Sequence, residues 1–139
     1  MKCIDTTYFV DLIRRPSAIR TITQKLDTGG VHATTVFNVY EALFGAYAIK
    51  DEEKREKVED KLKKAISRMK VLDFNYTDAV KAAELGGTLA HKGKHVGADT
   101  IIAAIAINKG CDAVVTRNEN HFRWIEEISG LKAEIYQFE

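Results

Sequence analysis

The feature that most constrains this chain is the regular exchange of short apolar runs with longer helix-forming stretches. In the longer stretches, apolar side chains recur every three to four residues, which is the period of an amphipathic helix. Strands that alternate with helices form parallel sheets covered by helices on both faces. We therefore predict an α/β protein, with three α/β/α layers around a central, mostly parallel, five-stranded sheet. The predicted strands are Cys3–Ile4, Val31–Thr35, Lys70–Phe74, Ala113–Thr116 and Lys132–Phe138.

The segments between the strands carry the signals of helix starts and helix faces. Thr35 and Thr77 are predicted to cap helices, because a threonine hydroxyl can accept a hydrogen bond from the first helical turn. Residues 50–64 are mostly charged, and acid–lysine pairs four residues apart favour a solvated amphipathic helix there. The stretch Ile101–Ile107 is apolar on nearly every side, which predicts a buried helix.

Length and composition exclude several classes of protein. A chain of 139 residues fits one domain, 1–139, and a net charge of +1 leaves nucleic-acid binding to a local patch. The longest apolar run, Ile101–Ile107, is far shorter than the ~18 residues of a membrane span. Asp5 interrupts the start of the chain where a signal peptide would be apolar, so we expect a cytoplasmic protein. Cys3 and Cys111 lack metal-ligand spacing and are predicted to be buried thiols.

The predicted topology brings four polar residues to one edge of the sheet. Asp5 follows the first strand directly, and Glu41 lies about two turns into the helix that leaves the second strand. Asp99 opens a helix that delivers the chain to the start of the fourth strand, so this residue lies at the carboxyl edge. Asn118 follows the fourth strand by two residues. Ligands of parallel sheets bind at this edge.

Each of these residues also has a purely structural interpretation. Asp5 and Asp99 could cap their helices or interact with the helix dipoles. Glu41 is harder to explain in this way, because it sits on an apolar helix face that we expect to be largely buried. Carboxylates gathered at one edge repel each other unless a cation neutralises them, and oxygen ligands without cysteine suit Mg²⁺ or Mn²⁺. Taken together, the four residues favour a metal site.

Four segments that span nearly the whole chain share a pattern with a known family. These segments are IDTTYFVDLI at 4–13, TTVFNVYEALFGA at 34–46, GADTIIAAIAI at 97–107 and VVTRNENHF at 114–122. Together they resemble the PIN-domain ribonucleases, and specifically the VapC-type toxins of bacterial and archaeal toxin–antitoxin pairs. The resemblance implies a PIN-like fold and a metal-dependent endoribonuclease that uses Mg²⁺ or Mn²⁺.

The resemblance also implies roles for individual residues. Asp5, Glu41 and Asp99 match the acidic metal ligands of the family. The family often has a fourth acid where this chain has Asn118, so either Asn118 or the neighbouring Glu119 would complete the catalytic site. Thr6 and Thr116 match hydroxyl groups that orient the acids.

Partners are implied by the same resemblance and by the cations near this edge. An RNA substrate, a homodimer and a small antitoxin are expected. Among the cationic residues, Arg117, Lys94 and Arg14 are the candidates for binding the RNA backbone.

Two alternative functions remain open at this point. One is a catalytically weak PIN module that binds RNA or a protein partner, because Asn118 brings no charge to the site. The other is a receiver-type phosphoacceptor domain with Asp73 as acceptor. A receiver needs an adjacent acidic pair after its first strand, whereas Thr6 follows Asp5 here.

Overall fold

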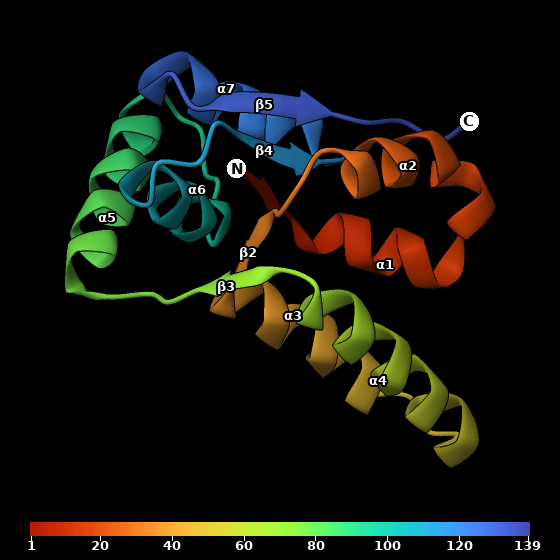
Figure 1. Ribbon diagram of the computed structural model, residues 1–139. Helices are drawn as coiled ribbons and strands as arrows, with labels where there is room; N and C mark the ends of the chain where they lie inside the picture. The colour runs from red at the N-terminus through yellow and green to blue at the C-terminus, as the bar shows by residue number, and fades with distance from the viewer.

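The computed structural model describes residues 1–139 and confirms the predicted three-layer α/β fold. The sheet has the order β3-β2-β1-β4-β5, and every neighbouring pair of strands is parallel (Figure 1). The order reverses between β1 and β4, and such a switch point opens a crevice at the carboxyl ends of the strands. The strands are β1 (Lys2–Ile4), β2 (Ala33–Thr35), β3 (Lys70–Leu72), β4 (Ala113–Thr116) and β5 (Lys132–Ile135).

Helices cover both faces of this sheet (Figure 1). One face carries α1 (Thr6–Arg14), α2 (Arg20–Thr28), α3 (Val36–Tyr47) and α4 (Glu52–Ser67), with a 3₁₀ turn (Pro16–Ile19) before α2. The other face carries α5 (Tyr76–His91), α6 (Asp99–Asn108) and α7 (Glu119–Ser129).

The core is divided by the sheet into two apolar layers. Successive side chains of a strand point to opposite faces, so Cys3 packs toward α5–α7 and Ile4 toward α1–α4. Val114 and Val115 divide in the same way. The stretch Ile102–Ala106 of α6 is fully buried, which confirms the predicted buried helix. No helix has the length and apolar character needed to cross a membrane.

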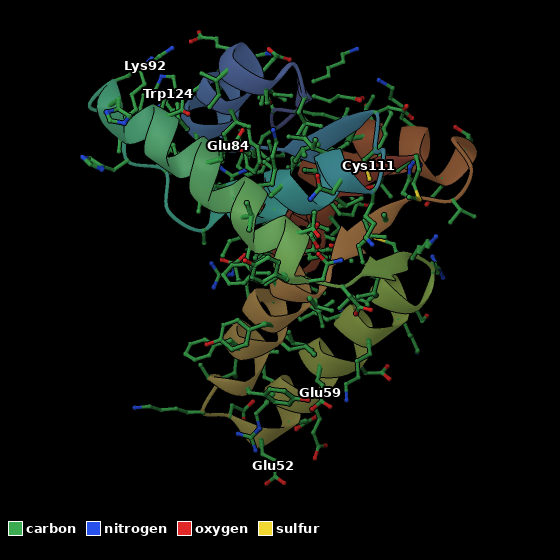
Figure 2. The ribbon with its side chains drawn as sticks, turned by 90° about the vertical axis from the view of Figure 1, so that its left-hand side faces the viewer. Glu52, Glu59, Glu84, Lys92, Cys111 and Trp124 are labelled. Carbon is green, nitrogen blue, oxygen red and sulfur yellow. The ribbon has the colours of Figure 1, made fainter.

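The α3–α4 pair projects away from the sheet, and Figure 2 shows Glu52 near its tip. The predicted acid–lysine pairs of α4 form, with Glu59 and Lys63 at 2.7 Å. The expectation that the apolar face of α3 is largely buried is wrong, because Tyr40, Phe44 and Tyr47 are each more than half exposed. Helical periodicity predicts an apolar face, but it does not predict whether another element of the structure covers that face.

Several predicted boundaries also need correction. Thr77 is not a cap, because α5 begins at Tyr76, two residues earlier than predicted, and its N-cap residue is Asn75. The Asn75 side chain accepts a hydrogen bond from the Asp78 N–H at 3.0 Å, and the Asp78 carboxylate accepts one from the Asn75 N–H at 3.0 Å. The third and fifth strands end at Leu72 and Ile135, before the predicted Phe74 and Phe138. Both cysteines are buried and unpaired, as predicted.

This correction gives the first prediction. Asn75→Ala removes one half of a reciprocal cap, and we expect the free energy of unfolding to fall by about 1 kcal/mol. Thr77→Ala is the matched control, since Thr77 is exposed and is not the cap residue. We expect its effect to stay within about 0.5 kcal/mol. Urea denaturation followed by circular dichroism measures both changes, and equal effects would contradict the assignment.

Candidate active site at the carboxyl edge of the sheet

Asp5 lies directly after β1 and is buried, with 3% of its surface exposed. It occupies the N-cap position of α1, but its side chain makes no capping bond. Its carboxylate instead accepts hydrogen bonds from the Thr116 hydroxyl at 2.7 Å, the Asn38 amide at 3.2 Å and the Thr7 hydroxyl at 3.3 Å. Burial raises the pKa of Asp5, and these hydrogen bonds oppose the rise. The capping interpretation therefore does not describe this side chain.

Glu41 is held beside Asp5 through α3. The Thr6 hydroxyl donates to Glu41 Oε1 at 2.7 Å. The Asn38 amide donates to both the Thr6 hydroxyl at 2.9 Å and Asp5 Oδ1 at 3.2 Å. Asn38 is itself fixed by a reciprocal cap with Thr35 at the start of α3. One buried amide thus binds Asp5 directly and also binds the Thr6 hydroxyl that donates to Glu41.

Asp99 is the first residue of α6, and Ala98 takes the N-cap position. Its Oδ2 accepts a hydrogen bond from the Asn118 amide at 2.9 Å and lies 2.8 Å from His121 Nδ1. Burial raises the pKa of Asp99 to about 6, and the charges of Asp5 and Glu41 add to the rise, while the His121 contact opposes it. The charges of Asp5 and Glu41 therefore reach Asp99, which places the three carboxylates at one edge of the sheet.

Sequence reasoning missed two parts of this arrangement. Asn38 was not singled out, although a Thr35–Asn38 pair three residues apart at a helix start is a capping signal. His121 is the second, because it lies 22 positions from Asp99 and no local pattern links the two residues. Glu119, the alternative to Asn118, is exposed and faces Arg123 at 4.0 Å. Asn118 is thus the neighbour of Asp99, to which it presents its amide nitrogen.

The donor set fits a hard divalent cation. Asp5, Glu41 and Asp99 supply only carboxylate oxygens, which Mg²⁺ and Mn²⁺ prefer. Burial and the charges of the other two carboxylates disfavour the charged state of Asp99. As the side chains stand, no three acidic, histidine or cysteine groups are close enough to enclose one ion. Their oxygens are instead turned toward Thr6, Asn118 and His121.

The cations expected to bind substrate do not surround these acids. Arg117 forms an ion pair with the buried Asp11, at 2.8 Å. Lys94 lies over the ring of Trp124, 5.3 Å from its centroid, and 4.0 Å from Glu127. Arg14 lies at the rim of a groove between α1, α3 and α4. The structure therefore separates the three candidates rather than gathering them.

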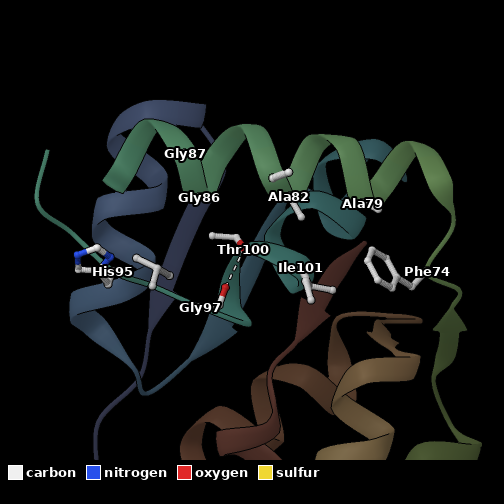
Figure 3. Close-up of a pocket in the computed structure, with 11 residues that line it drawn as sticks. Phe74, Ala79, Ala82, Gly86, Gly87, His95, Gly97, Thr100 and Ile101 are labelled. Atoms are coloured by element: carbon white, nitrogen blue, oxygen red, sulfur yellow. Dashed lines mark hydrogen bonds between the residues drawn. The ribbon is translucent and has the colours of Figure 1, made fainter. Parts of the chain in front are cut away.

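A second groove begins next to Asp99 and runs between α5 and α6 (Figure 3). Its volume is about 530 Å³, and Gly86, Gly87 and Ala82 of α5 form one wall. The Thr100 hydroxyl donates to the Gly97 carbonyl at 2.8 Å across its floor. No acidic side chain lines this groove, so it adjoins the acidic site without contributing to it.

Comparison with known proteins agrees with this arrangement. The chain matches the PIN domain family over residues 2–127. It is 25% identical to a chain of VapBC2 from Rickettsia felis bound to a DNA fragment from its promoter, with 98% of each chain covered and a TM-score of 0.81. It is 27% identical to a chain of DNA-bound VapBC from Salmonella typhimurium, with 96% of each covered and a TM-score of 0.79.

A more distant structure shares the fold alone. It is VapC20 from Mycobacterium tuberculosis, described as a toxin that cleaves the sarcin-ricin loop, with 13% identity, 82% and 87% of the two chains covered and a TM-score of 0.59. Among curated protein sequences, none matches. The family match over nearly the whole chain leaves the receiver-type alternative without support. The chain therefore belongs to the PIN domain family, and it is similar to chains of VapBC complexes.

Proposed function

We propose that this chain is the toxin of a VapBC-type pair and hydrolyses RNA at the carboxyl edge of its sheet. Asp5, Glu41 and Asp99 would hold Mg²⁺ or Mn²⁺ there, with Asn118 at the side of Asp99. The observation that carries the proposal is the gathering of these carboxylates at the switch point, where burial, together with the charges of Asp5 and Glu41, raises the pKa of Asp99 to about 6. Repulsion among these carboxylates is unfavourable by itself, and a bound divalent cation would offset it. In a member of a nuclease family, that cation is the use we propose for the three charges.

The residues around the acids orient them before any substrate arrives. Thr116 and Asn38 fix the two oxygens of Asp5, because one hydroxyl donates to Oδ2 and one amide N–H donates to Oδ1. Thr6 holds Glu41 in the same manner. When bound, a divalent cation lowers the pKa of a coordinated water and stabilises negative charge on the phosphate. Held carboxylates reduce the reorganisation that binding such a cation requires.

The bond that breaks determines the product ends. In the PIN ribonucleases that the sequence resembles, water attacks phosphorus and the 3′-oxygen leaves. We therefore expect 5′-phosphate and 3′-hydroxyl ends. A 2′,3′-cyclic phosphate on the product would contradict this mechanism, because it forms when the RNA 2′-hydroxyl attacks instead of water.

The second prediction tests the acidic site. We expect Asp99→Asn and Asp5→Asn each to lower cleavage of an end-labelled structured RNA pool by more than about 100-fold, since partners of metal ligands alone contribute about 10–100-fold. Cleavage by the unmodified protein should require Mg²⁺ or Mn²⁺ and stop in EDTA. Asp60→Asn, at an exposed ion pair on α4, is the control and should cleave normally. Cleavage that persists in EDTA would contradict the proposal.

The third prediction concerns the stability of the metal-free protein. The pKa of Asp99 is raised to about 6, so the folded state disfavours the ionised carboxyl above that pH. We expect Asp99→Asn to raise the free energy of unfolding at pH 7.5 in EDTA by about 1–2 kcal/mol. The gain should shrink as the pH falls from 6 toward 4 and vanish below about pH 3, where the Asp99 carboxyl is protonated in both the folded and the unfolded state.

Thermal and urea unfolding in EDTA, at several pH values, measure this difference. Asp60→Asn again serves as the control, because its exposed carboxylate carries no comparable repulsion, and it should change stability by less than about 0.5 kcal/mol. A destabilised Asp99→Asn protein at pH 7.5 would show that the hydrogen bonds to Asp99 outweigh the repulsion.

The groove between α1, α3 and α4 supports the antitoxin part of the proposal. It has a volume of about 740 Å³ and an apolar floor that includes Phe9, Ile13 and Leu62. No acidic side chain lines it, and four cations stand around it. This chemistry favours an apolar segment that carries acidic side chains, and we propose that the antitoxin supplies that segment. The four cations are Arg14, Lys54, Lys57 and Lys61.

The fourth prediction tests this groove. We expect the double substitution Lys57→Glu/Lys61→Glu to weaken antitoxin binding at least about ten-fold, because like charges then meet across the interface. Lys64→Glu is the matched control, since Lys64 is on the same helix but does not line the groove. Calorimetric titration with the antitoxin measures the affinities, and equal losses in both proteins would place the antitoxin elsewhere.

A further inference from the structure

Asp11 is a buried carboxylate that the acidic site does not use. It lies on α1, and only 1% of its surface is exposed. Arg117 binds it with two parallel contacts, from Nε to Oδ2 at 2.8 Å and from the terminal nitrogen to Oδ1 at 3.2 Å. The Tyr136 hydroxyl donates to Oδ2 at 2.7 Å. Both oxygens of Asp11 are therefore satisfied by groups far from it in sequence, and we call these three residues the Asp11 clamp.

The Arg117 guanidinium is also packed on its other side. Its central carbon lies 4.5 Å from the centroid of the Phe138 ring, a distance typical of a cation–π contact. Burial and the neighbouring Asp11 carboxylate raise the pKa of Tyr136, so its hydroxyl stays protonated and remains a donor. The family match ends at residue 127, so Tyr136 and Phe138 lie outside the matched segment.

The position of Arg117 in the chain gives the clamp its importance. It stands between Thr116, which donates to Asp5, and Asn118, which donates to Asp99. The Arg117 N–H donates to the Thr7 hydroxyl at 3.0 Å, and the Asn118 N–H donates to the Thr116 hydroxyl at 3.0 Å. Holding the Arg117 side chain against α1 therefore holds the turn between β4 and α7.

We propose that the Asp11 clamp positions this turn, so that Thr116 meets Asp5 and Asn118 meets Asp99, and that Arg117 is a positioning residue rather than an RNA contact. This inference rests on the proposed function, because it assigns a task within the same site. To turn this paired side of its guanidinium toward a phosphate, Arg117 would have to leave the buried Asp11 carboxylate without its partner, and that loss opposes binding. The two-pronged pairing with Asp11 already uses the geometry that would recognise a phosphate.

The fifth prediction separates positioning from RNA binding by kinetics. We expect Arg117→Met to lower kcat about ten-fold while KM for RNA stays within about two-fold, since misplaced catalytic groups reduce the rate of the bound complex. Tyr136→Phe keeps the ring and the ion pair and should lower kcat in the same direction by about three-fold. Arg117→Lys should not restore the rate, because lysine keeps the charge but lacks the planar fork. Arg15→Met is the control, because the Arg15 guanidinium also lies near the Phe138 ring. We expect its kcat and its KM for RNA to equal those of the unmodified protein.

RNA affinity in EDTA gives a readout that does not depend on turnover. An RNA contact would make the slope of log affinity against log salt smaller by about one in Arg117→Met. We expect the slope to be unchanged. A reduced slope with a raised KM, together with a normal Tyr136→Phe protein, would overturn the proposal. If Arg117→Met does not fold, the same measurements of kcat, KM and salt dependence are made on Tyr136→Phe and Asp11→Asn.

Hydrogen exchange distinguishes failure of this inference from failure of the proposed function. We expect the amides of Arg117 and Asn118 to exchange faster in Tyr136→Phe and Asp11→Asn than in the unmodified protein and in Arg15→Met. This result is required whether or not RNA is cleaved, and unchanged exchange would overturn the inference. Absence of metal-dependent cleavage in the unmodified protein, with faster exchange in the variants, would overturn only the proposed function.

Discussion

The buried carboxylate of Asp5 is the constraint on which the rest of the structure depends. A charge at the centre of a parallel sheet is unfavourable unless hydrogen-bond donors reach it. Here the donors come from three separate segments: Thr7 of α1, Asn38 of α3 and Thr116 of β4. Satisfying one carboxylate therefore joins β1 to its neighbour β4 and to two helices. The charge of Asp5 also reaches Asp99, where it adds to the rise in pKa that burial causes.

Much of this arrangement could be predicted from the sequence, because it follows from periodicity and topology. Strand and helix periods differ, and helices that return the chain to parallel strands must begin at the carboxyl edge. Asp5, Asp99 and Asn118 could be placed at one edge without knowing any distance. The exposed face of α3 could not be foreseen, since Tyr40 has the same apolar signal whether or not another element covers it.

The partners of charged side chains were the least predictable part of the site. Arg117 and Asp11 are separated by 106 positions, and no local pattern joins them. From sequence alone, Arg117 is a cation beside a catalytic motif, so RNA binding was the natural hypothesis. The three-dimensional structure adds a buried carboxylate, a tyrosine hydroxyl and an aromatic ring around it. His121 and Asp99 are 22 positions apart, and no local pattern joins them either, so sequence does not predict their contact.

The pairing of these cations also affects how RNA can approach. Arg117 is bound to Asp11, and Lys94 lies between Trp124 and Glu127, so neither is a free positive charge beside the acids. Under the proposed function, Asp5, Glu41 and Asp99 bring negative charge to the edge where RNA would bind, and that charge repels a phosphate. A divalent cation held there would offset this charge, because it brings two positive charges to the same place. RNA binding and metal binding would then be coupled by electrostatics, which gives a chain with net charge +1 a physical reason to place its acids together.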